Sequence, residues 1–85
     1  AAAPIRKRSL EDAKAMWEAG ERDADALRDA VASVLDGELL ADVEYVSLSD
    51  NITLDELNGE VNRPALLSLV AKFGKTRLLD NVDLV

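Results

Sequence analysis

Gly74-Lys75-Thr76 is the segment whose residue types could bind phosphate, because Lys and Thr in this order contact phosphate and magnesium in phosphate-binding loops. The complete motif also requires a glycine five residues before Gly74, and Leu69 occupies that position. In such a loop a helix follows the Lys-Thr pair, whereas Arg77-Leu78-Leu79 is typical of a strand. The segment therefore predicts a turn between two strands and not a nucleotide site.

Lys75 and Arg77 remain the two functional candidates, because they lie in the segment that carries the family resemblance described below and could point at an anionic ligand held by a neighbouring domain. A structural role is the alternative, in which Arg77 pairs with Asp80 or with an acid on a helix. Both interpretations stay open at this point. We name no catalytic, cofactor-binding or metal-ligating residue in the chain.

An acidic cluster could suggest a calcium site, but it lacks the required pattern; it comprises Asp50, Asn51, Asp55, Glu56 and Glu60. An EF-hand beginning at Asp50 would need Gly at position 55 and Glu at position 61, where the chain has Asp55 and Val61. The cluster therefore predicts a solvated acidic loop. The neighbouring Asn51-Ile52-Thr53 satisfies the glycosylation sequon, but we expect it to stay unmodified because no secretion signal accompanies it.

Composition excludes several classes of function. The chain has 85 residues with no Cys and no His, which excludes disulfides, thiolate chemistry and the usual neutral-pH proton shuttle. A net charge of -7 argues against nucleic acid as a partner. No apolar run is long enough for a signal core or a membrane span, so we expect a cytoplasmic protein without a membrane partner.

The first half of the chain predicts two helices. We expect residues 1–9 to be a flexible segment, since a short basic run such as Arg6-Lys7-Arg8 is typical of a disordered terminus or of one introduced for expression. Ser9 with Asp12 predicts an N-cap for a helix over about 10–19, which Gly20 ends. Its Trp17 and Met16 predict core packing rather than a binding face. A second helix over about 24–36 is capped by Asp23 or Asp25 and closed by Gly37.

The second half predicts three strands, over about 43–48, 65–72 and 76–82. Periodicity alone leaves a buried helix as an alternative for the middle segment, which is apolar on both faces. Between the first two strands, residues 53–59 predict a helical turn that packs Leu54 and Leu57. The predicted fold is α+β, with two N-terminal helices packed on a small three-stranded antiparallel sheet, and residues 10–85 form a single domain.

Three segments carry a resemblance to a known family. Phe73-Gly74-Lys75-Thr76-Arg77-Leu78-Leu79-Asp80-Asn81 resembles the terminal signature of pantothenate synthetases, also called pantoate-beta-alanine ligases. Gly20-Glu21-Arg22-Asp23 and Val43-Glu44-Tyr45-Val46-Ser47-Leu48 are similar to two further family segments and stand in the same order. The chain departs from the family at Asn51-Ile52-Thr53-Leu54, where members often have Pro-Glu-Thr-Leu.

The resemblance implies a function. Members activate pantoate with ATP to an acyl-adenylate, from which the amine of beta-alanine displaces AMP. Their His-x-Gly-His motif has no counterpart here, and the nearest segment to Ser-Ser-Arg-Asn is Arg6-Lys7-Arg8-Ser9, which does not match. The resemblance therefore implies a C-terminal lid-like domain that is inactive alone, with ATP and magnesium expected only in the full-length enzyme.

The implied partner is the N-terminal nucleotide-binding domain of the same enzyme. Because a domain taken from a larger enzyme leaves an apolar face bare, we also expect a weak homodimer. Two other hypotheses remain: a free-standing small acidic protein-interaction module without catalytic activity, and an acidic domain with a purely structural role.

Overall fold

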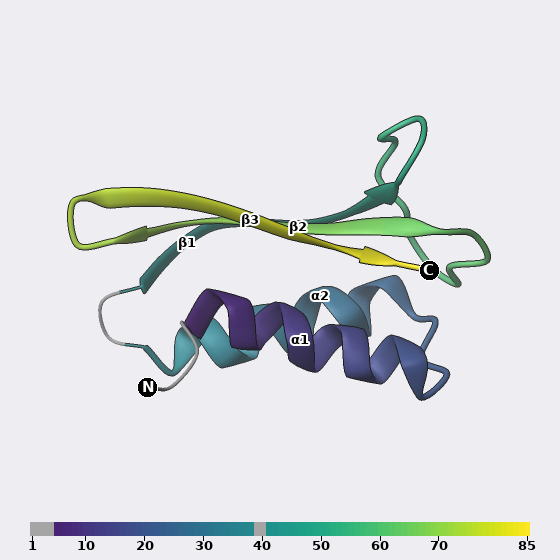
Figure 1. The fold of residues 1–85 in the computed structure, drawn as a ribbon, viewed down its shortest axis with the longest axis horizontal. Coiled ribbons are helices and arrows are strands. Elements are labelled where there is room, and N and C mark those ends of the chain that lie inside the picture. The colour runs from purple at the N-terminus through teal and green to yellow at the C-terminus, as the bar shows by residue number, and fades with distance from the viewer. Residues whose placement is uncertain (1–4, 39–40) are drawn as a thin grey trace.

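Two helices cover one face of a three-stranded antiparallel sheet, so the domain has two layers (Figure 1). The computed structural model describes residues 5–38 and 41–85. Its elements are α1 (Ile5–Glu18), α2 (Ala24–Asp36), β1 (Ala41–Asp50), β2 (Ala65–Phe73) and β3 (Thr76–Leu84). The α+β class predicted from the sequence is confirmed. Each strand is longer than predicted at one or both ends.

The second helix follows its sequence signals closely. Asp23 is the N-cap, with an extended backbone and a carboxylate that accepts a hydrogen bond from the Asp25 amide at 3.1 Å. Leu27, Val31 and Leu35 recur at helical spacing, and all three are fully buried. This stripe is the part of α2 that faces the sheet.

The first helix begins earlier than predicted. It starts at Ile5, so residues 5–9 form its first turns and the prediction of a flexible segment is wrong there; residues 1–4 lie outside the described residues. Ser9 is not the N-cap, because it is buried within the helix and its hydroxyl donates to the Arg6 carbonyl at 2.6 Å. Tertiary contacts explain the extension, since Ile5 packs against the core and Arg6 approaches Asp80 of β3.

The link between the helices ends α1 as predicted. Gly20 adopts a positive φ of 109°, and the Gly20 and Glu21 amides donate to the Trp17 and Met16 carbonyls. This pattern is a Schellman motif, in which a residue without Cβ turns the chain away from the helix axis. Arg22 then stacks over the Trp17 ring, 3.7 Å from its centroid, and donates a hydrogen bond to the Trp17 carbonyl near the end of the helix.

β2 is the central strand of the sheet, in the order β1-β2-β3. Its inward residues Ala65, Leu67, Leu69 and Ala71 are all fully buried against the helices. The prediction of a strand is therefore confirmed over the alternative of a buried helix. A two-residue turn, Gly74-Lys75, joins β2 to β3, since Phe73 pairs with Thr76 and Gly74 has a positive φ of 64°.

Removal of the α2 cap should destabilise the domain. We expect Asp23→Ala to lower the free energy of unfolding by about 1 kcal/mol, because the first-turn amide loses its carboxylate acceptor. Urea unfolding at neutral pH measures this. Asp29→Ala, an exposed acid inside the same helix, is the matched control and should change stability far less. Equal effects of the two substitutions would contradict the assigned cap.

Candidate functional site

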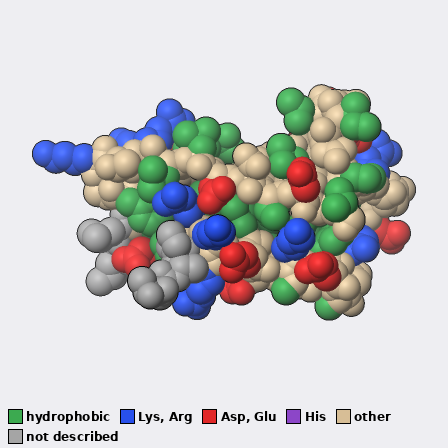
Figure 2. All heavy atoms as spheres, viewed as in Figure 1, with side chains coloured by type: hydrophobic (Ala, Val, Ile, Leu, Met, Phe, Trp, Pro, Cys, Tyr) green, Lys and Arg blue, Asp and Glu red, His purple; other side chains and the backbone are tan. Residues whose placement is uncertain are grey.

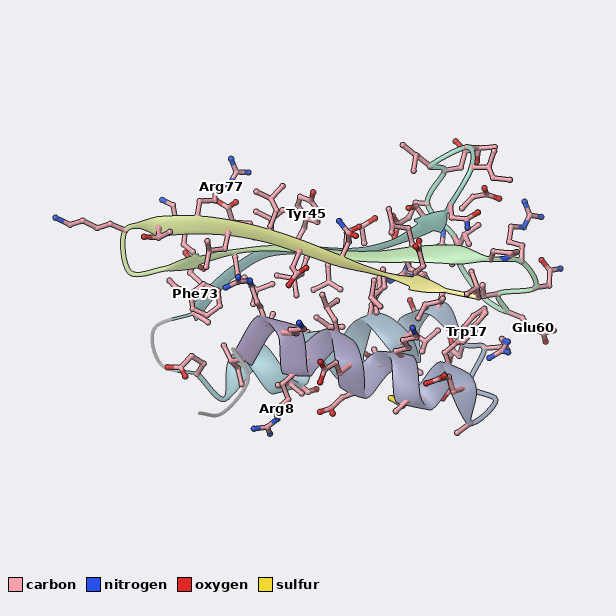
Figure 3. All side chains as sticks on the ribbon, viewed as in Figure 1. Arg8, Trp17, Tyr45, Glu60, Phe73 and Arg77 are labelled. Carbon is pink, nitrogen blue, oxygen red and sulfur yellow. The ribbon has the colours of Figure 1, made fainter. Side chains whose placement is uncertain are left out.

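The outer face of the sheet, opposite the helices, carries an apolar stripe that the described residues leave uncovered. Tyr45, Val70 and Leu79 are register neighbours across β1, β2 and β3. Tyr45 is 49% exposed and Leu79 is 69% exposed, while Val70 between them is only 1% exposed. Tyr45 projects from the side of the sheet opposite Trp17 and Phe73 (Figure 3). The stripe thus exposes Tyr45 and Leu79 to solvent on either side of the buried Val70.

Two polar rows border this stripe. Ser47, Ser68 and Asn81 form the next row toward the free end of β3. On the other side, Lys72 pairs with Arg77 in the register, and the Arg77 Nε donates to Glu44 Oε2 at 2.6 Å. An apolar centre with a polar rim is the composition typical of a protein-protein interface.

The chain between β1 and β2 rises above the same outer face (Figure 1). We call residues 51–57 the raised loop. Figure 2 shows hydrophobic side chains on it and above the sheet; in the raised loop these are Ile52, 87% exposed, and Leu54, 64% exposed. Between the raised loop and the sheet lies a shallow, solvent-open pocket of about 520 Å³. Its lining includes Tyr45, Leu54, Leu66 and Ser68.

Asp50 fixes the start of the raised loop. Its Oδ1 accepts hydrogen bonds from the Ile52 and Thr53 amides at 2.8 and 3.0 Å, and its Oδ2 pairs with Arg63 at 3.2 Å. The two amides, with a smaller contribution from Arg63, lower the pKa of the Asp50 carboxyl below its ordinary value. The side chain is 12% exposed, so it is a structural carboxylate rather than a solvent-facing one.

Arg28 of α2 fixes the other end of the raised loop. Its guanidinium donates to Glu56 Oε2 at 2.7 Å and to the carbonyl of Leu57 at 2.8 Å. Glu56 in turn accepts from the Leu48 amide at 3.0 Å and from the Ser47 hydroxyl. The Arg28 side chain is only 15% exposed, and its forked donors tie the loop to α2 in a defined geometry.

Leu54 has an unusual backbone conformation. Its φ is +64°, and it is the one non-glycine residue with positive φ in the part of the chain that the structure describes. For a leucine this conformation costs about 1–2 kcal/mol relative to right-handed geometry. The Leu54 amide donates to the Asp50 carbonyl at 2.9 Å, so a single helical turn ends at this residue.

The helical turn predicted over residues 53–59 is therefore wrong. The turn lies earlier, because Asp50 binds the amides of residues 52 and 53 and starts it there. Leu57 packs against the core as predicted, but Leu54 faces solvent instead. No sequence pattern predicts which of the two leucines is buried, since their different exposure depends on the backbone conformation at Leu54.

The structure places the two sequence candidates differently. Arg77 has an acidic partner, as the structural alternative supposed, but this partner is Glu44 of β1 and not Asp80 or an acid on a helix. Lys75 lies exposed at the tip of the β2–β3 turn, and no ion pair of the described residues involves it. The exposed tip leaves Lys75 accessible to an anion, whereas Arg77 already has a carboxylate partner in Glu44.

Asp80 and Asn81 close the signature segment and have structural roles. Asp80 pairs with buried Leu69 in the register, so it lies on the inner side of the edge strand β3. There it is 3.5 Å from the Arg6 Nε, and its Oδ1 accepts from the Asn81 amide at 2.9 Å. An inward charge and an occupied amide both discourage another strand from pairing with this edge.

Two further features bear on function. Within residues 5–38 and 41–85, no group of three or more acidic side chains is placed to hold a metal ion. In the same part of the chain, none of the helices has the length and apolar character needed to span a bilayer.

The comparisons with known proteins agree on one family. The family model described as pantoate-beta-alanine ligase matches residues 1–83. A pantothenate synthetase from Chloroflexus aurantiacus is 47% identical over 81 residues, which cover 95% of this chain and 29% of that protein. One from Pelotomaculum thermopropionicum is 45% identical over 83 residues, covering 98% of this chain and 29% of the relative.

A solved structure has the same fold. The pantothenate synthetase from Thermus thermophilus superposes with a TM-score of 0.82 at 22% identity, over 96% of this chain and 29% of that one. The chain therefore spans only about 29% of the length of the relatives that it matches, and it corresponds to their C-terminal portion.

The lowered pKa of Asp50 predicts a pH dependence of stability. A carboxyl whose pKa is lower in the folded state stabilises the fold above its unfolded pKa, and this contribution is lost as pH falls below about 4. We expect Asp50→Ala to be less stable than the parent at pH 7, with a difference that shrinks on acidification. Urea unfolding from pH 7 to pH 3 measures it.

Asp55→Ala is the matched control, because Asp55 lies in the same loop and bonds to Asp50 through its backbone carbonyl. The Asp55→Ala substitution should leave the pH dependence of the unfolding free energy as it is in the parent. A constant difference between parent and Asp50→Ala across the series would show that the carboxylate plays no such part.

Proposed function

This chain belongs to the pantoate-beta-alanine ligase family, and we propose from that premise that it is the lid domain of a pantothenate synthetase. The complete enzyme would condense pantoate and beta-alanine with ATP through a pantoyl-adenylate, as a step of pantothenate and coenzyme A biosynthesis. The chain alone would be inactive. It would work in the cytoplasm, joined to or bound by an N-terminal nucleotide-binding domain.

The observation that carries the proposal is the bare apolar stripe on a domain that matches only 29% of its relatives' length. A helix layer covers the inner face of the sheet, but nothing in the described chain covers Tyr45 and Leu79. In a longer enzyme, the remaining polypeptide is available to meet this face. The stripe is thus the surface through which a lid would contact the domain that it closes.

The chemistry explains why such a lid is needed. An acyl-adenylate hydrolyses readily in water, so the site must stay dry until the amine arrives. A rigid domain that closes over the site excludes water without supplying a catalytic group. ATP and magnesium would bind to the remainder of the enzyme. Lys75, at the exposed turn, is the side chain here that could approach the phosphates once the lid closes.

Complementation tests the proposal. We expect no pantothenate from this chain alone. We expect measurable turnover when the chain is added to a truncated Chloroflexus aurantiacus enzyme that lacks the segment matching this chain. That segment is 47% identical to this chain. Coupled detection of AMP release measures the rate. An unrelated acidic domain of similar size is the control.

A fusion of the same two parts guards against weak association in trans. If a folded fusion that binds ATP forms no pantothenate, the lid assignment is wrong. Association of the two parts without turnover in either format would instead favour the free-standing interaction module.

Self-association should follow from the same bare stripe. We expect a weak dimer of the isolated chain at high concentration, because apolar stripes on two copies can cover each other. Leu79→Ser should reduce it without unfolding the protein, since Leu79 is already 69% exposed. Light scattering over a concentration series measures the mass. A monomer at every concentration would contradict this expectation.

A further inference from the structure

We propose that the raised loop is the latch of the lid, with Leu54 as its main anchor and Ile52 beside it. The occupant of this surface is an apolar pocket with a basic rim on the nucleotide-binding portion of the enzyme. The inference rests on the proposed function and adds to it the segment of the lid that holds the partner. It does not involve Lys75 or the β2–β3 turn.

The identity of Leu54 is not explained by the stability of the domain itself. The residue is 64% exposed, and its backbone has a positive φ that Gly or Asn adopts more easily. An exposed leucine in a strained conformation gives the isolated domain neither burial nor favourable backbone geometry. A strained residue at a protruding position is typical of a functional contact.

The raised loop is held in a defined shape although it protrudes. Asp50 binds two of its amides at one end, and Arg28 binds Glu56 and the Leu57 carbonyl at the other. The Leu57 amide also donates to the Leu48 carbonyl at 2.8 Å, which attaches the loop to the edge of β1. A surface fixed before binding loses little conformational entropy when its partner arrives.

Charge distinguishes the occupant from a second copy of this chain. The raised loop exposes the Asp55 carboxylate next to its apolar residues, whereas the neighbouring Glu56 is already paired with Arg28. Two copies that met through this loop would bring their Asp55 carboxylates together, which disfavours pairing. A pocket with a Lys or Arg on its rim would instead complement Asp55. The relatives have further polypeptide within their own length that could supply this pocket, since this chain spans only 29% of it.

The shallow pocket beside the raised loop adds room for the partner. It lies between Leu54 on the loop and Tyr45 on the sheet, with Leu66 and Ser68 in its floor. A ridge from the partner could fill this shallow pocket while Leu54 enters the partner's pocket. The contact is then continuous with the apolar stripe around Tyr45 and Leu79.

The test substitutes Leu54→Asn, which removes the apolar side chain and suits a positive φ. We expect the unfolding midpoint of the chain to stay equal or rise, while binding to the upstream portion of the Chloroflexus aurantiacus enzyme weakens at least about tenfold by calorimetry. A merely structural leucine would give the opposite pattern, with lower stability and unchanged binding per folded molecule. Val85→Asn, an exposed apolar residue 78% accessible and outside the loop, is the matched control.

Ile52→Asn is the second variant, because Ile52 is 87% exposed and contributes little to the fold. We expect a smaller loss of affinity in the same direction, of about threefold, which corresponds to somewhat less than 1 kcal/mol. In the fused enzyme, both variants should raise the rate of adenylate hydrolysis relative to amide formation.

The outcomes separate this inference from the proposed function. If the parent chain neither binds the upstream portion nor restores activity in the fusion, the proposed function fails. If the parent binds and Leu54→Asn binds equally well, the latch is wrong while the lid stands. If Leu54→Asn weakens only self-association, the loop meets a second copy and the proposed occupant is wrong.

Discussion

The structure depends on a single packing constraint: a sheet of three strands has two faces, and the two short helices cover only one of them. The stripe of Leu27, Val31 and Leu35 meets the inward face of the sheet, where Leu67 and Leu69 are fully buried. With one Phe, one Tyr and one Trp in 85 residues, this core is built mainly from Leu, Val and Ala side chains around Trp17. Everything on the outer face is left to another contact.

Local signals in the sequence account for most of the fold. Gly20, Asp23 and Gly74 each stand where the backbone needs a stop, a cap or a turn, so the second helix and the β2–β3 hairpin were predictable. The start of α1 was not, because Ile5 and Arg6 extend the helix through contacts with residues far along the chain. A capping signal at Ser9 is a local preference that such contacts override.

The candidate surface was less accessible to sequence reasoning. Leu78 and Leu79 are identical neighbours in a strand, and only the register decides which of them faces the helices. Arg28 reaches residues 28 to 30 positions away, a separation that no motif encodes. The signature segment was visible as a pattern, yet its Arg77 pairs with Glu44 of β1 and its Asp80 with Arg6 of α1, contacts that the pattern does not specify.

The raised loop shows where stability and function diverge in this domain. Its ends are tied by Asp50 and Arg28, whereas its apex carries an exposed leucine in a costly conformation. Those bonds maintain the strain, because the loop cannot relax without breaking several of them at once. A small aliphatic core leaves little surplus stability, so strain at Leu54 is best understood through a contact made outside the domain. The shape of the domain is therefore set by its own core and that of the raised loop by Asp50 and Arg28, while the exposed Leu54 is accounted for by the contact that we propose.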